Sequence, residues 1–188
     1  MRYTFSMPLE DNIAEHPAHV NPYTAADVIA ILHENNWLKA DPNPEQTAWA
    51  DRAAQFLGHY AETPAGLANL LRLVFHYDAA QILRSTDAHT ALTRYAARDV
   101  IRHLALLLLD PAPFNSERFK QFVTELKEKL EVRSRDLFHP IRLVLAGRTG
   151  EGELDRVILL LDEAAALPFV VEVKSVRARV LEFCSALD

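Results

Sequence analysis

The chain has 188 residues, of which 49% are hydrophobic, so it is long enough to bury one good core, or a core with a small satellite. Its longest apolar run, residues 104–109, is too short to cross a membrane, and its start lacks the basic-then-apolar pattern of a signal peptide. We therefore expect a soluble cytoplasmic protein. The net charge of −6 argues against indiscriminate nucleic-acid binding, but residues 100–188 hold 13 basic and 14 acidic side chains, so a polyanion should meet this half.

Ten prolines divide the chain into segments in which apolar residues recur at spacings of three and four, a pattern typical of an all-α protein. The helices predicted in this way are 24–37, 49–60, 64–75, 87–109, 116–130, one beginning at Pro140, one through 154–161, and a last one through 176–187. We expect a multi-helix cage, built as one domain or as two helical lobes. Residues 1–62 would form an N-terminal helical lobe without an assigned role, and residues 63–188 the main domain.

Local signals fix several helix ends. Thr24 and Thr63 are predicted N-caps, Ser116 caps the helix that follows it, and Pro140 suits a first helical position, where its missing amide proton costs nothing. Gly147 falls where a residue in the left-handed conformation would end the helix that begins at Pro140. The long helix over 87–109 should bury its apolar stripe, which includes Ala88, Ala91, Leu92, Tyr95, Ala96, Leu104, Leu107 and Leu108.

Two features near the C-terminus are of less weight. Residues 170–173 could form a short strand, but one strand alone has no partner. Cys184, the only cysteine, cannot form an internal disulfide and lies on the apolar stripe of the last predicted helix with Val176, Val180 and Phe183. We expect a buried structural thiol.

The sequence offers no catalytic or metal-binding constellation. His16 and His19 lie in a proline-flanked irregular stretch, and no His-Glu-x-x-His motif or paired cysteines complete a zinc site. There is no Gly-x-Ser-x-Gly element for a serine nucleophile. The glycine-rich stretch 147–152 lacks a Gly-Lys-Ser/Thr ending and follows a helix rather than a strand, which favours a helix C-cap over a phosphate loop. We predict no catalytic residue, no metal and no cofactor.

Arginine is the side chain most able to carry function here. Its planar fork of five donors can bond a base edge and stack on an unpaired base, as in the reading of single-stranded RNA loops. Arg142 and Arg148 are placed for this by the Pro140 helix and the turn after it. Phosphate contacts could come from Arg133, Arg135, Lys174, Arg177 and Arg179. Composition alone favours the plainer interpretation that these are solvated charges, partly paired with Glu151, Glu153 and Asp155.

Residues 136–154 pack a helix start, an arginine, three of the five glycines and a new helix start into nineteen residues. This segment resembles the end of the anticodon-binding domain of bacterial glutamyl-tRNA synthetases, where a Pro-Leu-Arg helix, a Leu-Thr-Gly turn and an onward leucine-containing helix recur in this order. The resemblance is clearest from about residue 136 to 169, and weaker similarity in helix order extends back to about Thr63. It implies an all-helical cage that grips the glutamate anticodon loop.

The resemblance also implies roles for single residues. Arg142 occupies the position of the arginine that contacts the anticodon, and Leu154 retains the leucine of the following helix. Glu151 and Gly152 replace the Thr-Pro pair of some members. The RNA-binding residues expected on this basis are Arg142, Arg148, Leu154, Arg135 and Arg177.

The chain lacks the His-x-Gly-His and Lys-Met-Ser-Lys-like elements that class I synthetases need, and it has no alternating strand-helix pattern. We therefore predict a tRNA-binding module with no aminoacylation activity of its own, either free-standing or a C-terminal piece of a glutamate-tRNA ligase. The alternative is a helical protein-interaction domain that has kept the fold and docks on a synthetase or a regulatory partner. The Glu151-Gly152 replacement and the acidic N-terminal half favour that alternative.

Overall fold

The computed structural model describes residues 20–187, so the predictions for His16 and His19 lie outside the described residues. The described chain is all helical and contains no strand, which confirms the predicted fold class. Its α-helices are α1 (Ala25–Glu34), α2 (Pro44–Leu57), α3 (Pro64–Phe75), α4 (Ala79–Leu83), α5 (Thr86–Leu92), α6 (Ala97–Leu107), α7 (Ser116–Leu130), α8 (Ser134–Ala146), α9 (Gly152–Ile158), α10 (Leu161–Ala165) and α11 (Val176–Leu187). A 3-10 turn, η1 (Gly58–Tyr60), follows α2.

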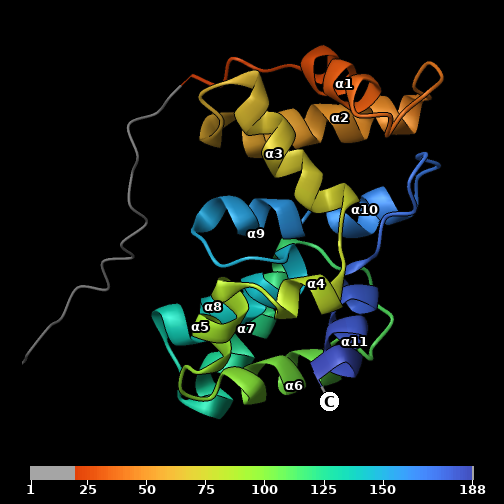
Figure 1. Ribbon diagram of the computed structural model, residues 1–188. Helices are drawn as coiled ribbons and strands as arrows, with labels where there is room; N and C mark the ends of the chain where they lie inside the picture. The colour runs from red at the N-terminus through yellow and green to blue at the C-terminus, as the bar shows by residue number, and fades with distance from the viewer. Residues whose placement is uncertain (1–19, 188) are drawn as a thin grey trace, which may run out of the picture.

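The helices form two groups joined by a middle layer (Figure 1). Helices α1, α2 and α3 make one group, and α4 to α8 with α11 make the other. Helix α9 packs against α2 and α3 on one side and against α8 on the other. Because the buried apolar side chains of both groups belong to one continuous cluster, the two groups share a single hydrophobic core.

An aromatic cluster fixes the first group to the segment after α10. Trp37 stacks on Phe75 with ring centroids 4.6 Å apart, and Phe169 meets the edges of Phe75 and Trp49 at 5.1 and 5.2 Å. The indole Nε1 of Trp49 donates to the carbonyl oxygen of Leu160 at 3.2 Å, so the one polar atom of this fully buried ring is satisfied. The chain that leaves α10 is thereby tied to α1–α3. No strand forms over residues 170–173; the Val170 amide donates to Trp37 instead.

The predicted caps of the first and third helices are confirmed. The amide and hydroxyl of Thr24 donate to Asp27, and the hydroxyl of Thr63 accepts from the Gly66 amide at 3.1 Å, just before Pro64. The cap predicted at Ser116 was one residue too late, because the Asn115 side chain accepts from the Arg118 amide at 2.9 Å.

The prediction of one long helix over residues 87–109 is wrong. The segment forms α5 and α6, which are separated at residues 93–96 where Ala96 adopts a left-handed conformation with φ of 54°. Apolar periodicity alone could not reveal this break, because it contains neither glycine nor proline. The consequence is largest for Tyr95, which was expected in the core and is instead 75% exposed.

The position of Pro140 was also predicted incorrectly. Helix α8 begins at Ser134, so Pro140 lies in its interior and removes the amide that would have bonded the carbonyl of Asp136. The turn before Pro140 is held by burial of Leu137 and by the contact of Phe138 with Arg142. Packing of the residues before Pro140 therefore allows α8 to begin at Ser134, although Pro140 by its helix propensity would favour the first helical position.

The C-terminal helices follow the prediction in part. The segment 154–161 divides into the end of α9 and the start of α10, and α11 buries Val176, Val180 and Phe183 as expected. Cys184 lies on the same helix but is only partly buried.

Candidate nucleic-acid interface

Arg142 lies on α8 with its guanidinium directed into the protein. Its Nε and Nη2 donate to the two carboxylate oxygens of Asp155 on α9 at 2.8 Å each, and its Nη1 donates to the carbonyl oxygen of Gly150 at 2.6 Å. The guanidinium carbon lies 4.9 Å from the ring centroid of Phe138, and only 10% of the side chain is exposed. In this conformation Arg142 fixes the turn between α8 and α9 through a bidentate ion pair.

The turn itself is closely packed. Gly147 ends α8 with φ of 83°, which confirms the left-handed closure predicted for it, and its amide donates to Leu143 at 3.0 Å. A Cβ on Gly150 would stand 2.8 Å from the Cδ1 atom of Leu154. Leu154 is fully buried, so it fills the space beneath the turn.

The other predicted contact residues lie in different places. Arg148 follows Gly147 in the turn and is half-buried, and Arg135 is exposed in the first turn of α8. Arg177 is exposed near the start of α11. The interactions found among the described residues join Arg142 to the turn, but none joins Arg177 to it.

A basic group that the sequence did not reveal surrounds His139 on α8. Burial, followed by the charges of Arg94, Arg142 and Arg135, holds the pKa of His139 below its usual value. Arg94 lies in the connection between α5 and α6, and its Nε and Nη2 both lie 2.8 Å from Asp136. We call Arg94, Arg135, His139 and Arg142 the arginine face. Asp136 is 42 positions from Arg94 in the chain, and Arg94 reaches it from the connection between α5 and α6.

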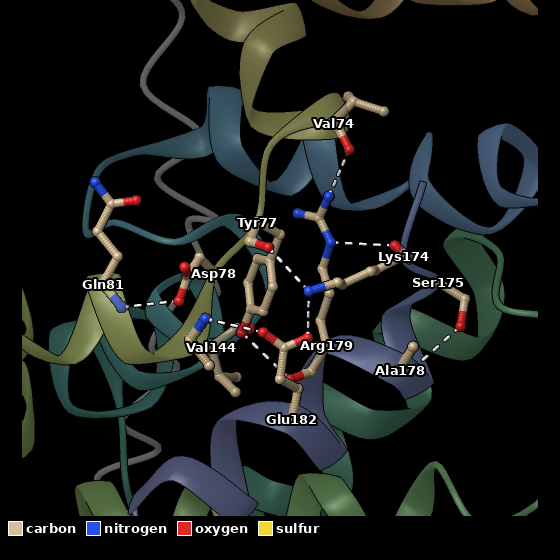
Figure 2. A network of polar contacts seen from close by, with 11 residues as sticks. Val74, Tyr77, Asp78, Gln81, Val144, Lys174, Ser175, Ala178, Arg179 and Glu182 are labelled. Atoms are coloured by element: carbon tan, nitrogen blue, oxygen red, sulfur yellow. Dashed lines mark hydrogen bonds and ion pairs between the residues drawn. The ribbon is translucent and has the colours of Figure 1, made fainter. Parts of the chain in front are cut away.

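One of the expected phosphate contacts, Arg179, has a structural role instead (Figure 2). Arg179 is fully buried and donates to the carbonyl oxygens of Leu73, Val74 and Leu145, and its Nε donates to that of Lys174 at 3.1 Å. The guanidinium nitrogens lie 2.9, 2.6 and 2.8 Å from the carbonyl oxygens of Leu73, Val74 and Leu145, respectively. Burial lowers the pKa of Arg179 to about 10. Its guanidinium therefore satisfies carbonyl groups at the C-terminal ends of α3 and α8 and has no surface to offer to a phosphate.

The rest of this network joins the α3–α4 connection to α11. Lys174 donates to the Tyr77 carbonyl oxygen at 3.0 Å and pairs with Glu182, while Glu182 also accepts from the Ala79 amide at 3.0 Å. The Tyr77 hydroxyl donates to a backbone carbonyl of α8, and burial raises its pKa. These side chains hold α3, α8 and α11 together.

The described residues contain no group of three or more histidine, cysteine, aspartate or glutamate side chains that could hold a metal ion. Over residues 20–187, none of the helices is both long enough and apolar enough to span a bilayer.

Comparison with known proteins identifies the class to which this arrangement belongs. Residues 18–167 match the family model described as the anticodon binding domain, so the chain belongs to this family of helical domains. Its relatives include glutamate–tRNA ligase 2 of Syntrophus aciditrophicus, 30% identical over 130 residues, which are 65% of this chain and 25% of that protein. Glutamate–tRNA ligase of Desulforudis audaxviator is 30% identical over 142 residues, 73% of this chain and 28% of that protein.

These matches confirm the resemblance to the anticodon-binding domain of glutamyl-tRNA synthetases. The matched segments are about a quarter of the length of these curated relatives. No solved structure gives a significant match to the chain.

Proposed function

We propose that this chain is a tRNA-binding module that contacts the anticodon stem-loop of a glutamate-type tRNA and has no aminoacylation activity of its own. The observation that carries the proposal is the arginine face, which lies inside the segment that matches the anticodon binding domain. It gathers three guanidinium groups and a half-buried imidazole from α8 and from the connection after α5. Arg94 and Arg142 are paired with Asp136 and Asp155, so the charge that this face offers to RNA is mainly that of the exposed Arg135.

The accessible residues are assigned direct contacts. Arg135 is exposed beside His139, and Arg148 stands on the turn that Arg142 fixes, so both can meet RNA without rearrangement of the fold. Arg177, exposed on α11, is assigned a phosphate contact away from the turn. The predicted role of Leu154 becomes support of the turn from below, because its side chain has no exposed surface.

Arg142 has a conditional role in this proposal. Its three hydrogen bonds within the protein occupy the donors that would read a base edge. Direct base reading therefore requires that RNA replace Asp155 as the acceptor. A base edge or a phosphate offers the same paired acceptors as a carboxylate, which makes such an exchange chemically balanced.

The test is fluorescence anisotropy with a labelled anticodon stem-loop of glutamate tRNA and with the same loop carrying an altered anticodon, at low and rising salt. We expect saturable binding that prefers the natural loop and weakens with salt. Arg135→Ala and Arg148→Ala should each weaken binding by about two- to fivefold, as expected for one exposed charge contact. Arg72→Ala, an exposed arginine on α3 in the other helical group, is the matched control. No binding at low salt by a folded protein would refute the proposal.

Asp155→Asn tests the role of Arg142. If Arg142 reads a base, weakening its internal partner should raise affinity, whereas Arg142→Ala lowers it. An equal loss in both variants would show that Arg142 only positions the turn.

A further inference from the structure

Tyr95 is the most exposed of the aromatic side chains in the described residues and directly follows Arg94, a member of the arginine face. Its side chain is 75% exposed in the short connection between α5 and α6. The preceding residue, Arg94, is fixed to Asp136 in the first turn of α8 by contacts of 2.8 Å. The helices on either side of Tyr95, α5 and α6, both pack against α8, whose first turn exposes Arg135.

The backbone around Tyr95 is ordered. The Ala97 amide donates to the Arg94 carbonyl at 3.3 Å, and the Val100 amide donates to the Ala96 carbonyl at 2.9 Å. Ala96 has φ of 54°, a left-handed conformation that residues with a Cβ rarely adopt. The tyrosine ring is thus presented to solvent by a defined turn, and strained residues of this kind cluster at ligand-binding sites.

The surroundings of Tyr95 are positively charged. The two segments that meet here, residues 93–102 and 133–142, contain six arginines and two carboxylates, and one of these arginines, Arg142, is paired with a third carboxylate, Asp155. Asp136 is paired with Arg94, and Asp99 lies 3.8 Å from Arg102. Arg98 and Arg135 are exposed and carry no carboxylate partner within the described ion pairs. This charge fits a polyanion and disfavours a basic protein surface.

We propose that Tyr95 is a stacking platform for an unpaired RNA base, with Arg98 and Arg135 contacting the phosphates on either side of it. This inference rests on the proposed RNA-binding function and extends its site beyond the Arg142 turn. Exposed aromatic rings flanked by cations bind single-stranded nucleic acid by stacking, which tolerates any base because every base has a flat π-face. Tyr95 would therefore strengthen binding without selecting the anticodon.

The experiment compares Tyr95→Ala with Tyr95→Phe, which keeps the ring and removes the hydroxyl. Leu106→Ala, which truncates an exposed apolar residue near the other end of α6, is the control. Binding of the labelled glutamate anticodon stem-loop is measured by anisotropy. In parallel, a loop carrying 2-aminopurine reports stacking by quenching. Circular dichroism checks the fold, which should be retained because Tyr95 is exposed.

We expect Tyr95→Ala to weaken binding by about five- to 100-fold and to relieve the 2-aminopurine quenching at one loop position, the range found when one stacking ring is removed. Tyr95→Phe and Leu106→Ala should stay within about twofold of the parent protein. If the parent protein binds and Tyr95→Ala binds equally well, the stacking inference is wrong while the proposed function stands. If the folded parent protein binds no stem-loop at low salt, the proposed function itself is wrong and this inference falls with it.

Discussion

The ion pair between Arg142 and Asp155 should be a major source of stability in the turn between α8 and α9. Arg142→Ala removes two hydrogen bonds to a carboxylate, one to the Gly150 carbonyl and the packing against Phe138. The two side chains are only 10% and 23% exposed, so the carboxylate left behind is poorly solvated.

Removing one partner of a fully buried pair costs about 3–5 kcal/mol. Because Asp155 retains some contact with water, we expect the lower end, about 3 kcal/mol for Arg142→Ala. Asp155→Asn keeps the shape and one acceptor oxygen and should cost about 2 kcal/mol. The double variant should lose less than the sum of the single losses, with a coupling energy of about 1–2 kcal/mol.

Urea unfolding followed by far-ultraviolet circular dichroism measures these free energies, and a double-mutant cycle isolates the pair. For a chain of this size about 3 kcal/mol corresponds to a fall in Tm of about 6–12 °C. Arg135→Ala, an exposed arginine in the first turn of the same helix, should change stability by less than about 0.5 kcal/mol. The reasoning would be refuted by a similarly small effect of Arg142→Ala, or by single losses that simply add.

Three further predictions concern buried or constrained residues near this turn. Gly147→Ala should lower the free energy of unfolding in urea by about 1–2 kcal/mol, because φ is 83° and the new Cβ would stand 3.1 Å from the Ile82 side chain. The control Gly66→Ala, in the first turn of α3, should be neutral or stabilising, and equal effects of the two changes would contradict this account. Arg179→Leu should cost at least about 3 kcal/mol because four backbone carbonyls lose their donor, and an unchanged urea midpoint would show that they find other partners. NMR titration should place the pKa of His139 below its usual value. The free energy of unfolding should therefore fall as the pH drops through the pKa of the unfolded state, because at that pH only the unfolded chain gains the proton. Arg94→Met should raise the pKa of His139, and an unchanged pKa would exclude the charge of Arg94 as one of its causes.

The helical class, the caps at Thr24 and Thr63 and the left-handed closure at Gly147 were predictable because each depends on residues within a few positions. The break at Ala96 and the continuation of α8 through Pro140 were not predictable, because neither glycine nor proline marks the break and because the burial of Leu137 outweighs the preference of Pro140 for a first helical position. The same limit applies to the candidate site. Its turn could be located from glycines and a resemblance, but Arg94 joins it only through a pairing across 42 positions.

The arginines show why side-chain type alone could not separate function from structure. From the sequence, Arg142 was expected to read a base, while Arg135 and Arg179 were both candidates for phosphate contacts. In the structure Arg135 is exposed, Arg142 is paired with the partly buried Asp155, and Arg179 is enclosed by backbone carbonyls. Arg179 can be enclosed because it donates four hydrogen bonds to backbone carbonyls, three of them near the C-terminal ends of α3 and α8. Arg142 stands between the two extremes, since its partner is a carboxylate that a phosphate or base edge can imitate. The bond that orders the turn in the unbound protein is therefore also the bond that RNA must replace if Arg142 is to read a base.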